Sequence, residues 1–155
     1  MTSLKTVNNF LGKKRLAIVG VSRNEADFSR GLFREFQKQG YDVVPVNPGL
    51  TQVEGLTCYP SVEHITPPVE GVLIMTAPAV TNQVVEDCAR AGVKLVWMHK
   101  GGGSGAVSQT AIAFCQKNGI EVIEGQCPYM FLPSSSGFVH RIHATVKKLT
   151  GSYPR

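Results

Sequence analysis

The sequence of 155 residues has few charged side chains and no long uninterrupted apolar run. Charged residues make up 17% of the chain and hydrophobic residues 43%, a balance that disfavours disorder because soluble domains average about 25% charged residues. The longest apolar runs, such as 69–79, are broken by polar residues or proline and fall short of the ~20 residues of a membrane helix. The N-terminal segment lacks the apolar stretch of a signal peptide. We therefore expect a cytoplasmic protein that does not act at a membrane.

Motifs for metal and nucleic-acid binding are also missing. The four cysteines lie far apart, without a CxxC pair or a Cys/His cluster at zinc spacing, so we expect reduced thiols and no metal. The net charge of +5 comes from mostly scattered lysines and arginines. A nucleic-acid-binding protein more often has a basic stripe with interleaved aromatic residues. A small polyanion suits this modest positive charge at least as well.

One pattern occurs three times along the chain. An amphipathic segment ends in a glycine (Gly40, Gly92 and Gly119), and an apolar strand follows within two residues. Glycine adopts the left-handed conformation that ends a helix, and the basic residue before it complements the negative helix end. Helices that alternate with strands indicate right-handed βαβ units, and therefore a parallel sheet covered on both faces.

Hydrophobic periodicity locates the expected elements. Five short runs rich in valine and isoleucine predict strands at 16–19, 43–46, 71–75, 95–98 and 121–123. Helical spacing predicts three apolar stripes, Phe28/Leu32/Phe33/Phe36, Val80/Val84/Val85/Cys88 and Val107/Ala111/Phe114/Cys115. A short leading helix capped by Thr2 or Ser3 and a closing helix at about 136–150 complete the chain. The expected fold is α/β, a doubly wound, Rossmann-like parallel sheet of about five strands in one three-layer domain spanning 1–155, with strand order 3-2-1-4-5.

In such a sheet, ligands bind beyond the carboxyl ends of the strands, where the strand order reverses. The loop after the first strand has Gly20 for a sharp turn and Ser22 for a hydroxyl contact. Arg23 and Arg30 add cationic donors beside the N–H groups of a helix start. We interpret this loop as a phosphate site; the alternative is an ordinary turn with exposed arginines.

The other loops offer less specific signals. Asn47 and Pro48 form a rigid turn in which Asn47 either caps the turn or contacts a ligand. The segment 75–80 is small and mostly apolar, and 97–105 is a glycine-rich stretch that forms either an anion cradle or a flap. A nicotinamide dinucleotide is disfavoured because Ser22 replaces the second glycine of GxGxxG and no acid ends the second strand.

Taken together, these loops resemble the family of small CoA-binding domain proteins, whose fold is shared with the N-terminal domain of the succinyl-CoA synthetase alpha subunit. The resemblance covers about 15–130 and is carried by AIVGVSR at 17–23, GYDVVPVNP at 40–48, GLTCYPS at 55–61, AGVKLVWM at 91–98 and CPYM at 127–130. It implies that coenzyme A binds across the strand ends. Many relatives carry glutamine after the Trp-Met pair, where this chain has His99.

The resemblance also implies contact residues for each part of the ligand. These are Gly20, Val21, Ser22 and Arg23 for the phosphates or ribose, Asn47 and Pro48 for the next part of the groove, Thr76, Ala77, Pro78 and Val80 for the adenine or pantetheine, and Met98 and His99 for the thiol arm.

The sequence predicts no catalytic residue. His99 is the one histidine on a predicted functional edge, and no acid is placed by sequence to orient it. The leading hypothesis is a module that binds CoA or an acyl-CoA as a carrier, sensor or regulator, alone or as a homo-oligomer. The alternatives are a subunit of an acyl-CoA ligase-type enzyme that needs a partner chain, and an NADP-binding protein.

Overall fold

The computed structural model describes residues 2–101 and 105–132. Their main sheet has five parallel strands, β1 (Arg15–Val19), β2 (Asp42–Val46), β5 (Gly71–Ile74), β6 (Leu95–His99) and β7 (Glu121–Gln126). The helices are α1 (Leu4–Leu11), α2 (Phe28–Lys38), α3 (Pro78–Arg90) and α4 (Gln109–Lys117). The predicted α/β, Rossmann-like class is thus confirmed. The predicted closing helix lies outside the described residues.

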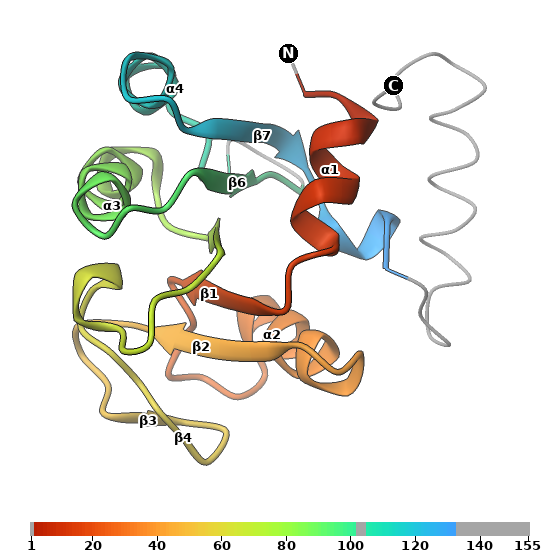
Figure 1. Ribbon diagram of the computed structural model, residues 1–155. Coiled ribbons are helices and arrows are strands. Elements are labelled where there is room, and N and C mark those ends of the chain that lie inside the picture. The colour runs from red at the N-terminus through yellow and green to blue at the C-terminus, as the bar shows by residue number, and fades with distance from the viewer. Residues whose placement is uncertain (1, 102–104, 133–155) are drawn as a thin grey trace.

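Helices cover both faces of the sheet, with α3 and α4 on one side and α1 and α2 on the other (Figure 1). Successive strand residues point to opposite faces, so a strand buried on both sides must be apolar throughout. In β6, Val96 and Met98 pack on the α3–α4 side, while Leu95 and Trp97 pack on the α1–α2 side. None of the helices in the described residues has the length and hydropathy that a membrane span requires.

The predicted helix ends are confirmed. Gly40, Gly92 and Gly119 follow α2, α3 and α4 with φ of 94°, 77° and 67°, in the region where glycine is favoured. At the start of α1, Ser3 is the N-cap, and its Oγ accepts a hydrogen bond from the Thr6 N–H at 3.1 Å.

The predicted strand order is wrong. The sheet is ordered β2-β1-β5-β6-β7, so the second strand forms an edge and the third strand of the main sheet lies beside the first. Pro45 within β2 explains this, because proline cannot donate to a ladder and is confined to edge strands. The Pro45 carbonyl oxygen points outward and accepts a hydrogen bond from the Tyr59 N–H at 3.0 Å. The strand order therefore reverses between β1 and β5.

The segment between β2 and β5 contains structure that the sequence did not predict. A small hairpin of β3 (Gln52–Val53) and β4 (Leu56–Thr57) is followed by the 3₁₀ helix η1 (Val62–His64), which packs on α3. A second 3₁₀ helix, η2 (Pro128–Met130), follows β7.

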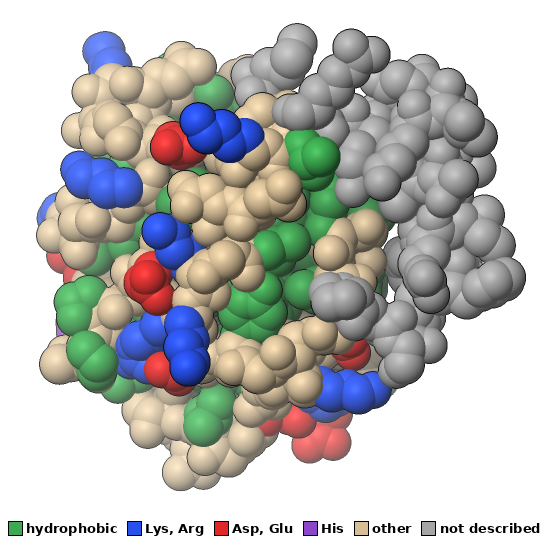
Figure 2. Space-filling model, turned by 45° about the vertical axis from the view of Figure 1, so that its right-hand side comes forward, with side chains coloured by type: hydrophobic (Ala, Val, Ile, Leu, Met, Phe, Trp, Pro, Cys, Tyr) green, Lys and Arg blue, Asp and Glu red, His purple; other side chains and the backbone are tan. Residues whose placement is uncertain are grey.

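On the face that Figure 2 shows, basic and acidic side chains lie interspersed, with no stripe of one sign.

Candidate functional site

The loop after β1 begins at Gly20, which lies beside Met75 at the end of β5. Gly20 has φ of 94°, and a Cβ on it would lie 2.8 Å from the Met75 carbonyl oxygen. Its N–H donates to the Val46 carbonyl of β2 at 3.0 Å. Only glycine fits this position, because both the backbone conformation and the contact exclude a side chain.

Asn47 ties this loop to the turn after β2. Its Nδ2 donates to the Val21 carbonyl at 2.8 Å, and its Oδ1 accepts from the Gly49 N–H at 2.8 Å. Arg23 extends to the same turn, with its guanidinium 3.5 Å from the Gly49 carbonyl oxygen. Asn47 thus holds two loops together, which is the capping role weighed from the sequence.

Arg30 is engaged within the protein. Its side chain is 7% exposed and forms an ion pair with Glu54 in the β3–β4 turn. It also donates to the Ser22 carbonyl at 3.2 Å. Arg34 contacts the same carboxylate at 3.3 Å. These contacts clamp the first loop to the hairpin, and the direct phosphate contact suggested for Arg30 stays a prediction.

The start of α2 carries its own anion. The Asp27 carboxylate accepts hydrogen bonds from Ser29 Oγ at 2.6 Å and Ser29 N–H at 2.9 Å, which hold the Asp27 pKa below its ordinary value. Ser29 Oγ in turn accepts from the Ser22 N–H at 2.9 Å. A carboxylate therefore already compensates the positive end of this helix.

One pocket, which we call the valine–proline pocket, has a volume of about 230 Å³. It lies between α3 and the ends of β1 and β2, and its walls are Val19, Gly20, Val46, Asn47, Pro48, Pro60, Ser61, Val62, Thr76, Val80, Gln83, Val84 and Asp87. The apolar part consists mainly of valine and proline side chains, while Asn47, Ser61, Thr76, Gln83 and Asp87 supply polar groups. Such a pocket suits a flat, largely apolar ring with a polar edge.

A second pocket, the His99 pocket, has a volume of about 260 Å³. Its walls are Gly20, Asp27, Phe28, Ser29, Met75, Thr76, Ala77, His99, Gly105 and Ala106. Gly20 and Thr76 line both pockets. The two pockets therefore adjoin at the point where the strand order reverses, and we refer to them together as the trough.

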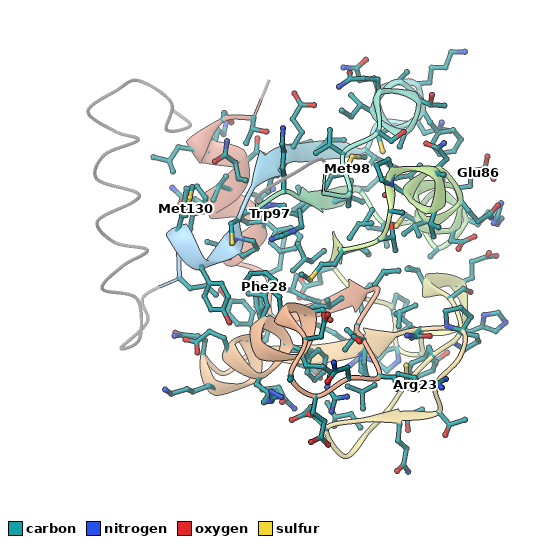
Figure 3. The ribbon with its side chains drawn as sticks, turned by 180° about the vertical axis from the view of Figure 1, so that it is seen from behind. Arg23, Phe28, Glu86, Trp97, Met98 and Met130 are labelled. Carbon is teal, nitrogen blue, oxygen red and sulfur yellow. The ribbon has the colours of Figure 1, made fainter. Side chains whose placement is uncertain are left out.

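His99 forms one wall of its pocket from the end of β6. Burial lowers the pKa of His99 below its ordinary value, which favours the neutral ring. Its ring centroid lies 5.4 Å from that of Phe28, which lies 5.5 Å from that of Tyr129. Figure 3 shows Phe28 on the Trp97 and Met130 side of the molecule and Arg23 on the side of the β3–β4 hairpin.

The trough brings together many, but not all, of the residues singled out in the sequence. It contains Gly20, Asn47, Pro48, Thr76, Ala77, Val80 and His99. Val21 and Met98 are fully buried in the core. Pro78 is the first residue of α3. The trough also contains residues that the sequence analysis did not assign to a site, among them Asp27, Phe28, Ser61, Gln83 and Asp87.

Cysteines and metal-ligating groups add no further site in the part of the chain that the structure describes. Cys58, Cys88 and Cys115 are buried, as expected for core residues, and burial raises the pKa of Cys115 to about 11. No group of three or more His, Cys, Asp or Glu side chains there is arranged to hold a metal ion.

Comparison with known proteins adds a family match. A model of a family described as "CoA binding domain" matches residues 14–133. The chain is 27% identical over 81 residues to an ADP-forming acetate–CoA ligase of Methanocaldococcus jannaschii, which covers 52% of this chain and 12% of the ligase. It is 25% identical over 114 residues to the uncharacterized protein YneT of Bacillus subtilis, covering 74% of this chain and 82% of YneT.

Solved structures give the same fold. A hypothetical protein from Pyrococcus horikoshii OT3 superimposes with a TM-score of 0.74 at 28% identity, covering 82% of this chain and 87% of that one. The dinucleotide-forming acetyl-coenzyme A synthetase 1 of Ca. Korarchaeum cryptofilum gives a TM-score of 0.67 at 23% identity, covering 77% of this chain and 27% of the synthetase. The chain thus spans most of the small relatives and only a fraction of the ligases.

Proposed function

Because the chain belongs to the CoA-binding domain family, we propose that its trough binds coenzyme A or an acyl-CoA. In this proposal the chain itself acts as a carrier, sensor or regulator and catalyses no reaction. The main support is that two different pockets meet at Gly20 and Thr76. The valine–proline pocket is mostly apolar, and the His99 pocket has both polar and apolar walls. A ligand with an aromatic head, a charged centre and a long arm fits such a pair.

The valine–proline pocket suits the adenine. Pro48, Val80 and Val84 offer apolar surface to the faces of the base, and the Asp87 carboxylate offers an acceptor for its amino group. Gln83 Nε2 donates to Asp87 Oδ1 at 3.0 Å, which orients that carboxylate along the pocket wall. An aromatic base would replace water over a mostly apolar surface, which is favourable for binding.

The phosphates are assigned to the surface near Gly20 and Arg23. Gly20 lets a ligand approach the backbone closely. Arg23 is exposed and contacts the Gly49 carbonyl at the long distance of 3.5 Å, so its guanidinium can turn toward a phosphate and form charged hydrogen bonds. The pantetheine arm then extends into the His99 pocket.

A second candidate is a CoA-binding subunit of an acyl-CoA ligase-type enzyme. The similarity to the ADP-forming acetate–CoA ligase favours it. In this second proposal, catalysis needs further parts of such a ligase, because the matched segment covers only 12% of that ligase.

Isothermal calorimetry on the full chain tests the proposal with CoA, desulfo-CoA and NADP as ligands. We expect CoA and desulfo-CoA to bind with similar affinity and NADP to bind more weakly. No heat and no thermal shift with either form of CoA would refute the proposal. An assay that follows the conversion of ATP to ADP in the presence of CoA and a carboxylic acid, with and without candidate partner chains, separates the binding module from the ligase subunit.

A further inference from the structure

Two side-chain atoms are buried without a hydrogen-bond partner among residues 2–101 and 105–132, namely His99 Nε2 and Gln126 Oε1. Buried polar atoms are nearly always paired with protein, water or a ligand, so each exception calls for a physical reason. These two atoms also belong to directly opposite residues. His99 and Gln126 are partners at the carboxyl ends of β6 and β7, the edge at which this fold binds ligands.

The backbone around both residues is fixed by hydrogen bonds. The Gln126 carbonyl accepts from the Trp97 indole N–H at 3.0 Å and from the Lys100 N–H at 3.3 Å. The His99 carbonyl accepts from the Ala106 N–H at 2.7 Å. The contact between the His99 and Phe28 rings further limits the imidazole. The two unpaired atoms are therefore features of an ordered strand end.

The chemistry of the two atoms narrows the group that would satisfy them. Gln126 Oε1 only accepts hydrogen bonds, so it needs an N–H or O–H from the ligand. A neutral imidazole presents at Nε2 either an N–H or a lone pair, depending on the tautomer. A secondary amide offers one N–H and one carbonyl oxygen on opposite sides of its C–N bond, and the pantetheine arm of CoA carries two such amides. An ionised phosphate has no N–H or O–H to donate, and an aliphatic acyl chain offers neither group.

We infer that His99 and Gln126 recognise the amides of the pantetheine arm, with Gln126 Oε1 accepting an amide N–H and His99 Nε2 donating to an amide carbonyl. His99 lines the pocket assigned to that arm. The inference rests on the proposed function and deepens it, because it adds Gln126 as a specificity residue. With this contact, the protein distinguishes CoA from nucleotides that contain the same phosphorylated adenosine but lack the pantetheine arm.

Calorimetry on the full chain tests this with two ligands, CoA and adenosine 3′,5′-bisphosphate, which keeps the adenosine and two phosphates but has no arm. Replacing one hydrogen-bond partner, in Gln126→Leu or His99→Leu, is expected to weaken CoA binding about tenfold. The affinity for the bisphosphate should stay within about twofold. The melting temperature of the ligand-free Gln126→Leu protein should not fall, because the variant removes an unpaired buried atom.

Gln116→Leu on the exposed side of α4 is the matched control, and it should change neither affinity. Equal losses for CoA and the bisphosphate, or unchanged CoA affinity in both variants, would overturn the inference. A wild-type protein that binds neither ligand would instead refute the proposed function. If Gln126→Leu does not fold, Gln126→Met carries the same comparison with an unbranched apolar side chain.

Discussion

The loops after β1 and β2 are held by side chains that bond to one another, whereas the ends of β6 and β7 keep two buried polar atoms unpaired within the described residues. On the first side, Asn47 joins two loops and Arg30 joins the first loop to the hairpin. On the second side, His99 Nε2 and Gln126 Oε1 are unpaired. Satisfied networks rigidify a structure, so the first side has the properties of a scaffold and the second those of a surface that a ligand completes.

Breaking the scaffold at its buried ion pair should give the largest effect. Glu54→Asn removes the carboxylate that pairs with Arg30, whose side chain is 7% exposed, and leaves a buried cation without its partner. Because removing one member of a buried pair is strongly destabilising, we expect a loss of about 3 kcal/mol in the free energy of unfolding, measured with urea. Asparagine tolerates the φ of 50° at this position, so the turn itself is kept.

Arg34→Ala is the control for this prediction. Arg34 contacts the same carboxylate, but its side chain is 40% exposed, and such pairs contribute less than about 1 kcal/mol. Equal losses in the two variants would contradict the view that the Arg30 pair clamps the loop. The comparison between the two sides of the trough would then lose its main support.

Arg23 lies on the scaffold side but is exposed. A substitution of Arg23 therefore tests ligand binding with little effect on the free energy of unfolding. Arg23→Ala should leave the unfolding free energy within about 0.5 kcal/mol of wild type, since it removes one long surface contact. If Arg23 binds a phosphate of CoA, the binding free energy should fall by about 1.5–3 kcal/mol for each charged hydrogen bond lost. Calorimetry of CoA binding measures this. An unchanged affinity would show that the phosphates bind elsewhere.

Gly20 lies where the two sides meet. Gly20→Ala places a Cβ 2.8 Å from the Met75 carbonyl oxygen at a φ of 94°, and strain of this kind costs about 1–3 kcal/mol. We expect the unfolding free energy to fall by that amount and CoA binding to weaken as well. Gly55→Ala is the control, because its φ of 76° is also left-handed but no atom lies within 4 Å of the added Cβ. A smaller loss for Gly20 than for Gly55 would contradict the close approach of β1 and β5.

Local patterns were sufficient to predict the five strands of the main sheet, the glycine helix ends and the sheet edge at which the trough lies. The strand order was missed although Pro45, within the second predicted strand, signals an edge position. The β3–β4 hairpin was missed because its strands are two residues long. Without the hairpin, no local pattern could place Glu54 beside Arg30, 24 residues away.

Gln126 was missed for a related reason. The strand predicted at 121–123 continues to Gln126 in β7, past Glu124 and Gly125, which interrupt the apolar pattern. Tertiary contacts extend it, because the strand pairs with β6 and the Glu124 N–H donates to Thr2 Oγ1 at 2.7 Å. A bond between residues so far apart in sequence has no local signature, so the residue opposite His99 emerges only from the folded sheet.

The smallest effect concerns the pH dependence of stability on the ligand-facing side. Burial lowers the pKa of His99 from its ordinary value of 6.5. The unfolded chain therefore takes up this proton at a higher pH than the folded chain does. Stability contributed by the neutral ring is present above pH 6.5, is lost as the pH falls toward the folded pKa, and levels off below it.

In His99→Gln this titration is absent, so the decrease in unfolding free energy between pH 7.5 and pH 5.5 should be smaller than in wild type. Urea unfolding at the two pH values measures the change in unfolding free energy for each protein. Subtracting the change in the variant from that in wild type cancels the contribution of the other titrating groups. Equal decreases in the two proteins would mean that the His99 ring is as solvated as the exposed side chains of the scaffold side, and that the two sides do not differ in this respect.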